Sequence, residues 1–472
     1  MKDKVTATLV QRLGLFTAIT IVIGSMIGSG IFKKTAVMSH DLGAPGVLLL
    51  VWVVAGLVTL VGALTNAEVA GVLPRAGGQY IYFKEMYGDF VAYLYGWSVF
   101  AVIQTGSIAA IAYVFSGYLE VFVPAPHLGA EWEAWGFSIP VAGVSVLDCY
   151  PLRDIGLKAV TILLILFLST VNYLGVLFGG TVNNVFTVLK CLALVFIVGA
   201  AFLWSGGSTG HFQPLVSSTF EYPEGTLLGA FVLSLSAAFW AYDGWNNITY
   251  LGAEVREPQR NVPRAMIIGI GFVIVVYVLV NLAYLYVLPV ERMAGSTLVA
   301  SDVMSAVVGG WGGAFVAVAV MVSTFGTTNG TILASARVYY AMAREGMFFR
   351  TVGEVHPRHG TPARAILIQA LWASLITMTG TFDQLTDMLI FVSWIFYGLG
   401  ALGVIVLRRK MPGAPRPYRV PGYPVLPILF VVFSAFFVIF SFVVNVRNAV
   451  FGLLLVVIGV PLYFVFRRAT RR

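Results

Sequence analysis

The sequence predicts an all-α integral membrane protein with twelve transmembrane helices. Hydrophobic residues make up 59% of the 472 residues and charged residues only 11%, which leaves too little polar surface to coat soluble domains of this size. Long apolar runs recur from end to end, and about 20 apolar residues are needed to cross the hydrocarbon core. The first and sixth runs also contain clusters of glycine and polar residues, which predict broken helices.

Twelve apolar runs can be counted along the chain. The first run lacks the small-residue cleavage site of a signal peptide, so we expect it to remain in the protein. The last two runs carry no intramembrane charge and are expected to serve as scaffold or as oligomer contacts. The approximate centres of the runs are Ile23, Thr59, Gln104, Phe167, Val195, Trp240, Val275, Gly326, Leu371, Ile395, Phe433 and Val457.

The first run is interrupted at Gly24–Gly30, which holds three glycines and two serines. Glycine loses the most backbone entropy on ordering and serine competes for backbone hydrogen bonds, so the helix is expected to break here. In lipid, freed backbone groups are tolerated only against protein or a water-filled cavity. A small zwitterion would satisfy them, with its carboxylate on the half-helix beginning near Ser29. The alternative is that Gly24 and Gly28 form a small-xxx-small pair that lets two helices pack closely.

The fifth run contains Lys190, about seven residues past its polar start. At 1.5 Å per residue this places its Cα roughly 10 Å into the membrane. The side chain could snorkel to the interface, or its ammonium could face the bundle interior in place of a bound monovalent cation. In the second case we expect oxygen partners at the Gly24 carbonyl and at the hydroxyls of Ser323 or Thr327 in the eighth run.

The sixth run is interrupted at Phe239–Asn247, where Asp243, a glycine and two asparagines lie at mid-membrane. A packing role explains this poorly, because a buried carboxylate is costly. Broken first and sixth spans are the pattern of inverted five-helix repeats with a binding site between them. We therefore expect a first repeat over 1–205 and a second over 206–410, followed by two helices and a cytoplasmic tail over 411–472.

Other polar residues are given simpler interpretations. Asp383 and Asp387, at the start of the tenth run, are expected to be loop charges. Cys149 and Cys191 are far apart, so we expect no disulfide between them and no metal site built on them. Cys149 lies in the longest outer loop, expected to be a short interfacial segment, where it could tether an accessory subunit. A free thiol is the preferred interpretation.

The basic residues predict the orientation of the chain. The formal charge is +8, but these residues are scattered among short loops, so we expect no nucleic-acid partner. With the N-terminus inside, the inner loops and ends hold 22 lysines and arginines and the outer side holds six. The positive-inside rule then predicts a multi-pass protein of the cytoplasmic membrane with both termini in the cytoplasm.

Four motifs resemble the amino acid-polyamine-organocation superfamily and, within it, the L-type amino acid transporter group. They are GSMIGSGIF at 24–32, PRAGGQY at 74–80, AYDGWN at 241–246, and GTTNG at 326–330 followed by REG at 344–346. The resemblance covers nearly the whole chain. It implies a LeuT-type fold with five-plus-five inverted repeats, and a secondary transporter of amino acids with no enzymatic activity and no cofactor.

The resemblance also implies roles for the motif residues. The substrate carboxylate would bind helix 1 backbone near Ser29 and Gly30, and Trp240 would be the gate above the site. Gly28 and Gly30 would lack side chains because substrate touches their backbone. The candidate substrate-binding residues are Ile23, Gly24, Ser25, Gly28, Ser29, Gly30, Trp240, Ala241, Asp243 and Asn246.

Coupling and substrate charge follow from two further positions. Lys190 matches the helix 5 lysine that stands in for the second sodium of sodium-coupled relatives, with Ser323 and Thr327 beside it. Asp243 departs from many neutral-substrate members, which have glycine there, and resembles branches that accept dibasic amino acids.

The expected function is sodium-independent movement of small or medium neutral L-amino acids by alternating access, with exchange preferred. The alternatives are a proton- or sodium-coupled symporter of the same architecture, and an exchanger that accepts cationic amino acids through Asp243. A channel would need a continuous polar path and an enzyme a catalytic cluster, and the sequence offers neither. We expect a stand-alone bacterial transporter with an amino acid and the lipid bilayer as its partners, and no accessory subunit.

Overall fold

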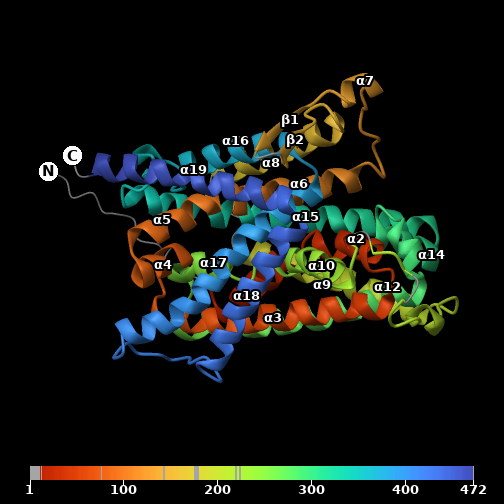
Figure 1. Cartoon of the computed structure of the whole chain (residues 1–472), viewed down its shortest axis with the longest axis horizontal. Coiled ribbons are helices and arrows are strands. Elements are labelled where there is room, and N and C mark those ends of the chain that lie inside the picture. The colour runs from red at the N-terminus through yellow and green to blue at the C-terminus, as the bar shows by residue number, and fades with distance from the viewer. Residues whose placement is uncertain are drawn as a thin grey trace.

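The computed structural model describes residues 11, 13–75, 77–141, 144–174, 180–217, 220–222 and 225–470. The chain forms a bundle of helices with one β-hairpin at its end (Figure 1). Among the described residues, ten helical segments are long and apolar enough to cross a membrane. The predicted helical membrane fold is therefore confirmed, while the expected cytoplasmic charges at Lys2, Lys4, Arg12, Arg471 and Arg472 lie outside the described residues.

The apolar runs of the first half fold into helices that often end at turns containing glycine or proline. α3 begins at Pro45, whose missing N–H costs no helical hydrogen bond at this position. The elements are α1 (Leu15–Met26), α2 (Gly30–Leu42), α3 (Pro45–Val72), α4 (Gln79–Tyr87), α5 (Asp89–Ser98), the π-helix η1 (Val99–Ile103), α6 (Gln104–Leu119), α7 (Ala130–Glu133), α8 (Ile155–Tyr173) and α9 (Gly180–Leu203).

Among its described residues, the second half contains longer helices and three shorter apolar ones, α10, α14 and α16. Three 3₁₀ turns lie between helices, η2 (Thr209–Phe212), η3 (Gly252–Glu254) and η4 (Arg350–Gly353). The helices are α10 (Leu227–Tyr242), α11 (Asn247–Tyr250), α12 (Pro258–Val287), α13 (Val290–Ala294), α14 (Val299–Val308), α15 (Gly310–Arg344), α16 (Ala363–Thr379), α17 (Phe382–Lys410), α18 (Val425–Val444) and α19 (Val446–Thr470).

The loop between α6 and α8 contains a β-hairpin that the sequence analysis did not predict. β1 (Phe137–Val141) and β2 (Val144–Cys149) pair antiparallel, and Arg447 of α19 binds the carboxylate of Asp148 at 2.8 Å. β-branched and small polar residues alternate in this loop, a pattern that indicates β-strands and could have predicted the hairpin. In Figure 1 the hairpin and α7 project from one end of the bundle, which we call the hairpin end.

The opposite end, which we call the basic end, carries α4 and the last turns of α15, α17 and α19 (Figure 1). Glu68 of α3 is only 2% exposed there and accepts both arms of Arg408, at 2.8 and 2.7 Å. Arg416 lies 3.3 Å from the same carboxylate. Because a buried carboxylate is tolerated only when paired, this cluster holds the basic loop after α17 against α3.

Candidate functional site

Both predicted helix breaks are present. α1 ends at Met26 and α2 begins at Gly30, while α10 ends at Tyr242 and α11 begins at Asn247. Gly244, in the second break, has φ +91°, a conformation that side chains rarely adopt. A Cβ on Gly244 would also meet the carbonyl oxygen of Ser25 at 2.9 Å. The two breaks therefore lie directly against each other.

The two breaks and α6 enclose a cavity of about 20 Å³. This is room for about one water, so an amino acid can enter only if the surrounding groups move apart. The predicted site residues that line the cavity are Ser25, Gly28, Ser29, Gly30, Trp240, Asp243 and Thr327.

The side of the cavity formed by Ser29 is suited to an anion. The first N–H groups of a helix have no partner within it, and no described side chain caps the start of α2. The Ser29 hydroxyl is buried and has no hydrogen-bond partner among the described residues. The helix dipole adds a partial positive charge at this point. A carboxylate placed here would therefore meet unsatisfied donors and a favourable field.

Gly28 and Gly30 differ in what surrounds them. A Cβ on Gly30 would lie 2.4 Å from the Cα of Ala241, so glycine is required for the close crossing of α2 and α10. A Cβ on Gly28 would have its nearest neighbour, the methyl carbon of Thr327, at 3.5 Å. Helix packing is therefore a sufficient reason for glycine at position 30, while substrate contact at Gly28 and Gly30 stays a prediction.

Trp240 lines the cavity and packs against Phe382, the first residue of α17. The Trp240 indole N–H is buried without a partner in the described part of the chain, and its ring meets the Phe382 ring at 6.0 Å. Behind them Lys34, only 1% exposed, donates to Asp383 at 2.6 Å and to Thr386 at 2.8 Å. The interpretation of Asp383 as a loop charge was wrong, because its carboxylate joins α17 to α2.

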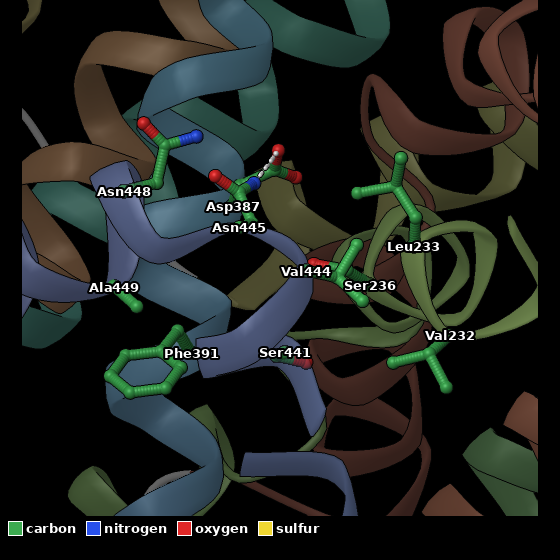
Figure 2. Close-up of a pocket in the computed structure, with 10 residues that line it drawn as sticks. All are labelled: Val232, Leu233, Ser236, Asp387, Phe391, Ser441, Val444, Asn445, Asn448 and Ala449. Atoms are coloured by element: carbon green, nitrogen blue, oxygen red, sulfur yellow. Dashed lines mark hydrogen bonds between the residues drawn. The ribbon is translucent and has the colours of Figure 1, made fainter. Parts of the chain in front are cut away.

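Asp387 is not a loop charge either. Figure 2 shows its Oδ2 accepting a hydrogen bond from Asn445 Nδ2, at 3.0 Å, beside a cavity of about 10 Å³. Ser236 of α10 and Ser441 of α18 line the same cavity. Both carboxylates lie in the first two turns of α17 and bond to other segments, Asp383 to Lys34 of α2 and Asp387 to Asn445 after α18. In the sequence, both aspartates stand at the start of an apolar run, and this position alone does not tell a bonded carboxylate from a loop charge.

Asp243 lines the cavity with one oxygen already engaged. Its Oδ1 accepts a hydrogen bond from the Tyr397 hydroxyl at 2.6 Å. The Tyr397 ring in turn packs on Trp245, with ring centroids 5.1 Å apart. The sequence analysis did not connect Asp243 to α17, because the two residues are 154 positions apart.

Four predicted site residues lie behind the cavity lining, namely Ile23, Gly24, Ala241 and Asn246. Asn246 donates to the Gln79 side chain at 3.1 Å. The Ile23 carbonyl accepts the N–H of Ile27, and the Ala241 carbonyl accepts the Tyr277 hydroxyl at 3.0 Å. These groups stabilise the two breaks, although a carbonyl with one bond keeps a second lone pair for another donor.

Lys190 lies inside the bundle and binds the first break. Its ammonium donates to the Gly24 carbonyl at 3.0 Å, the Ile27 carbonyl at 3.1 Å and the Thr327 hydroxyl at 2.6 Å. Ser323 donates to the same Ile27 carbonyl at 3.2 Å. The side chain is 4% exposed, so the snorkelling alternative does not hold. All three donors of the ammonium have an oxygen partner.

α6 supplies cavity residues that the sequence analysis missed, namely Gln104, Ser107 and Ile111. Gln104 donates to the Asn247 side chain at 3.3 Å and so joins α6 to the second break. It directly follows the π-helical turn η1, and such turns are frequent at functional sites. A polar amide at the centre of an apolar run was the signal in the sequence.

The cavity is also closed toward the basic end. The Leu13 N–H donates to the Glu254 carbonyl at 3.0 Å, and the Arg256 N–H donates to the Leu13 carbonyl at 2.8 Å. The Glu254 carboxylate is held by Arg337 at 2.8 Å. The site is therefore occluded, with contacts between segments of distant sequence at both ends.

Comparison with known proteins identifies the family. Residues 13–466 match the amino acid permease family. The chain belongs to this family. The amino acid permease is 33% identical to the human b(0,+)-type amino acid transporter 1 over 465 residues, which covers 98% of this chain and 89% of the relative. It is 31% identical to the serine/threonine exchanger SteT of Bacillus subtilis (strain 168), with 96% of each chain covered.

A third relative is the large neutral amino acids transporter small subunit 2 of Oryctolagus cuniculus, 32% identical over 459 residues, with 96% of this chain and 80% of the relative covered. These matches confirm the resemblance to the amino acid-polyamine-organocation superfamily and its L-type group. The permease is therefore a multi-pass membrane transporter of amino acids and not an enzyme.

Proposed function

We propose that this permease exchanges small or medium neutral L-amino acids across the cytoplasmic membrane, without sodium, by alternating access. The observation that carries the proposal is the occluded cavity between two helix breaks, with the uncapped start of α2 on one side. A zwitterion fits it, because its carboxylate can take the free N–H groups and its ammonium the broken-helix carbonyls. The printed name of the Bacillus relative, an exchanger of serine and threonine, supports exchange of small neutral substrates.

We assign the architecture as twelve spans of the LeuT type. α16, and α10 together with α11, would add two spans to the ten longer segments. Reciprocal packing supports inverted repeats over 1–205 and 206–410, because α1 packs along α12 while α10 packs along α3. The Tyr277 hydroxyl of α12 also bonds to the last turns of both broken helices, at the carbonyls of Met26 (2.8 Å) and Ala241 (3.0 Å). α18 and α19 follow the repeats, and the basic end would face the cytoplasm.

In this proposal the ten predicted residues contribute in two ways. Ser25, Gly28, Ser29, Gly30, Trp240 and Asp243 would contact the substrate, since they line the cavity. Ile23, Gly24, Ala241 and Asn246 would hold the breaks open behind it. Lys190 would replace a bound cation, because its ammonium already occupies a cluster of two carbonyl oxygens and one hydroxyl.

The test is counterflow into liposomes loaded with unlabelled amino acid, with external sodium replaced by choline. We expect uptake of labelled serine or alanine to continue in choline. Strict dependence on sodium would contradict the proposal in favour of sodium symport. Uptake driven by an imposed pH gradient into empty liposomes would instead indicate proton symport.

Substrate charge is the second part of the proposal. Asp243 faces the cavity, and its carboxylate favours a cationic amino acid as the alternative substrate. Its Oδ1, however, already accepts a hydrogen bond from Tyr397. We expect alanine, serine and leucine to compete with labelled substrate and arginine and lysine to compete weakly. Tyr397→Phe frees the carboxylate oxygen, so competition by arginine should rise about tenfold, as expected for one charge-assisted hydrogen bond. Displacement of substrate by arginine alone in the wild-type protein would overturn the neutral assignment.

We also propose that the permease works without an accessory subunit. Cys149, the outer-loop thiol that could form a tether, is 3% exposed and its Sγ lies 3.5 Å from the Met378 carbonyl. Burial raises the pKa of the Cys149 thiol, which lowers the fraction of reactive thiolate at neutral pH.

Cys149 is accordingly expected to resist labelling. In a Cys191→Ser background, maleimide should label less than about a tenth of the folded protein in the time that labels all of the SDS-denatured protein, since the thiol is buried and protonated. Rapid labelling of the folded protein, or a disulfide from Cys149 to a second protein in native membranes, would contradict the stand-alone assignment.

A further inference from the structure

A pocket of about 650 Å³ opens at the basic end, beside the last turns of α15 and α19. Both helices are membrane-spanning segments, and they end at Arg344 and Thr470. The pocket therefore lies at the level where the hydrocarbon core gives way to headgroups and water. It shares no lining residue with the cavity between the helix breaks.

One wall of this pocket is aromatic. Phe348 is buried, while Phe349 is 49% exposed. The ring centroids of Phe349 and Phe466 lie 5.3 Å apart with the rings perpendicular, and Phe348 lies 6.1 Å from Phe466. An aromatic surface at the edge of the bilayer offers apolar contact to the upper part of a lipid chain.

Two arginines line the pocket and two more follow a lining residue in sequence. Arg344 and Arg350 line it, and Arg467 and Arg468 directly follow Phe466 in α19. Arg467 packs on the Tyr463 ring, 5.8 Å from its centroid. Within the described residues, none of the four side chains pairs with a carboxylate. With respect to the described carboxylates, their guanidinium donors are therefore free to bind an anion.

Glu345, the acidic residue that lines the pocket, and Glu354, the next acidic residue in sequence, are both paired with basic side chains. Glu345 lines the pocket, but its carboxylate binds Lys84 at 2.9 Å and the Tyr80 hydroxyl at 2.7 Å. Glu354 pairs with Arg364 at 2.8 Å. The local charge balance is therefore positive, and nothing among these groups would repel an incoming phosphate.

We propose that this pocket binds an anionic phospholipid, with the arginines on the headgroup phosphate and the phenylalanine wall against the acyl chain. Guanidinium groups match phosphate oxygens with paired hydrogen bonds, and basic pockets between spans at the cytoplasmic surface suit acidic headgroups. A soluble phosphate would use the arginines but gain nothing from Phe349 and Phe466. The site is independent of which amino acid the permease carries, so this inference and the proposed function can fail separately.

The test uses the full chain in detergent, titrated with dioctanoyl phosphatidylglycerol, with bound lipid counted by native mass spectrometry. We expect binding that dioctanoyl phosphatidylcholine does not reproduce. Arg344→Gln with Arg350→Gln should weaken phosphatidylglycerol binding at least about tenfold, since each arginine contributes to attraction of an acidic lipid. Lysine at both positions keeps the charge and should retain most of the binding.

Arg358→Gln with Arg409→Gln is the matched control, because it removes the same charge from exposed positions at the same end. Binding by the control should stay within about twofold of wild type. Phe349→Ala keeps every charge and should weaken the lipid but not glycerol 3-phosphate. The proposal is overturned if phosphatidylcholine binds as well as phosphatidylglycerol, or if the control variant loses as much phosphatidylglycerol binding as the Arg344/Arg350 variant. It is also overturned if glycerol 3-phosphate displaces the lipid at equal concentration, or if neither the arginine pair nor Phe349→Ala weakens lipid binding.

Discussion

Lys190→Ala is expected to remove at least about 90% of amino acid exchange, a tenfold loss that corresponds to about 1.4 kcal/mol. The reason is that the ammonium joins Gly24 and Ile27 of the first break to Thr327 of α15. Charge-assisted hydrogen bonds contribute roughly 1.5–3 kcal/mol each, so the loss of three exceeds this threshold. Without them the break would no longer be held in the geometry that receives substrate.

The variant should still fold, because alanine also removes the cost of a buried charge. Lys158→Ala is the matched control. Lys158 is also a buried lysine of a membrane span, but it donates to the Tyr150 carbonyl at 2.7 Å, and neither residue lines the cavity. Counterflow per folded protein, with folding checked by gel filtration, should fall for Lys190→Ala and persist for Lys158→Ala. Near-normal exchange by Lys190→Ala would show that the lysine is structural only.

Gly28→Leu is expected to abolish substrate binding in a protein that remains folded. A Cβ at this position has its nearest neighbour at 3.5 Å, so the chain can accept a side chain there. The Cβ position faces Thr327, which also lines the cavity, so the leucine is expected to take up cavity space that the substrate needs. The measurement is substrate-dependent thermal stabilisation, which should disappear.

Gly30→Ala should have a different effect, because its Cβ would meet the Ala241 backbone at 2.4 Å. Overpacking of this kind costs about 1–3 kcal/mol, so the melting temperature without substrate should fall. Gly271→Leu is the control, since nothing lies within 4 Å of its Cβ position, and it should keep binding and stability. Wild-type binding by Gly28→Leu would place the substrate elsewhere.

The sequence alone predicts the breaks and the deep lysine because each depends on local composition. Three glycines and two serines in Gly24–Gly30 weaken any helix, wherever it packs. A lysine at the depth of Lys190 needs oxygen partners, and only a few polar groups in the other spans can supply them. Hydropathy likewise identifies the spans, because every crossing must satisfy the same bilayer thickness.

Only the tertiary structure decides which distant side chains meet. Lys34 and Asp383 are 349 residues apart, and Asp243 and Tyr397 are 154 apart, so periodicity within one helix carries no information about either pair. The same holds for Gly30, whose requirement for a bare backbone comes from its crossing with Ala241. Local composition therefore determined where this chain spans and where its helices break. The packing of those helices determined which polar groups close the cavity. A buried polar group must be hydrogen-bonded, and the fold decides which partner lies within hydrogen-bond distance.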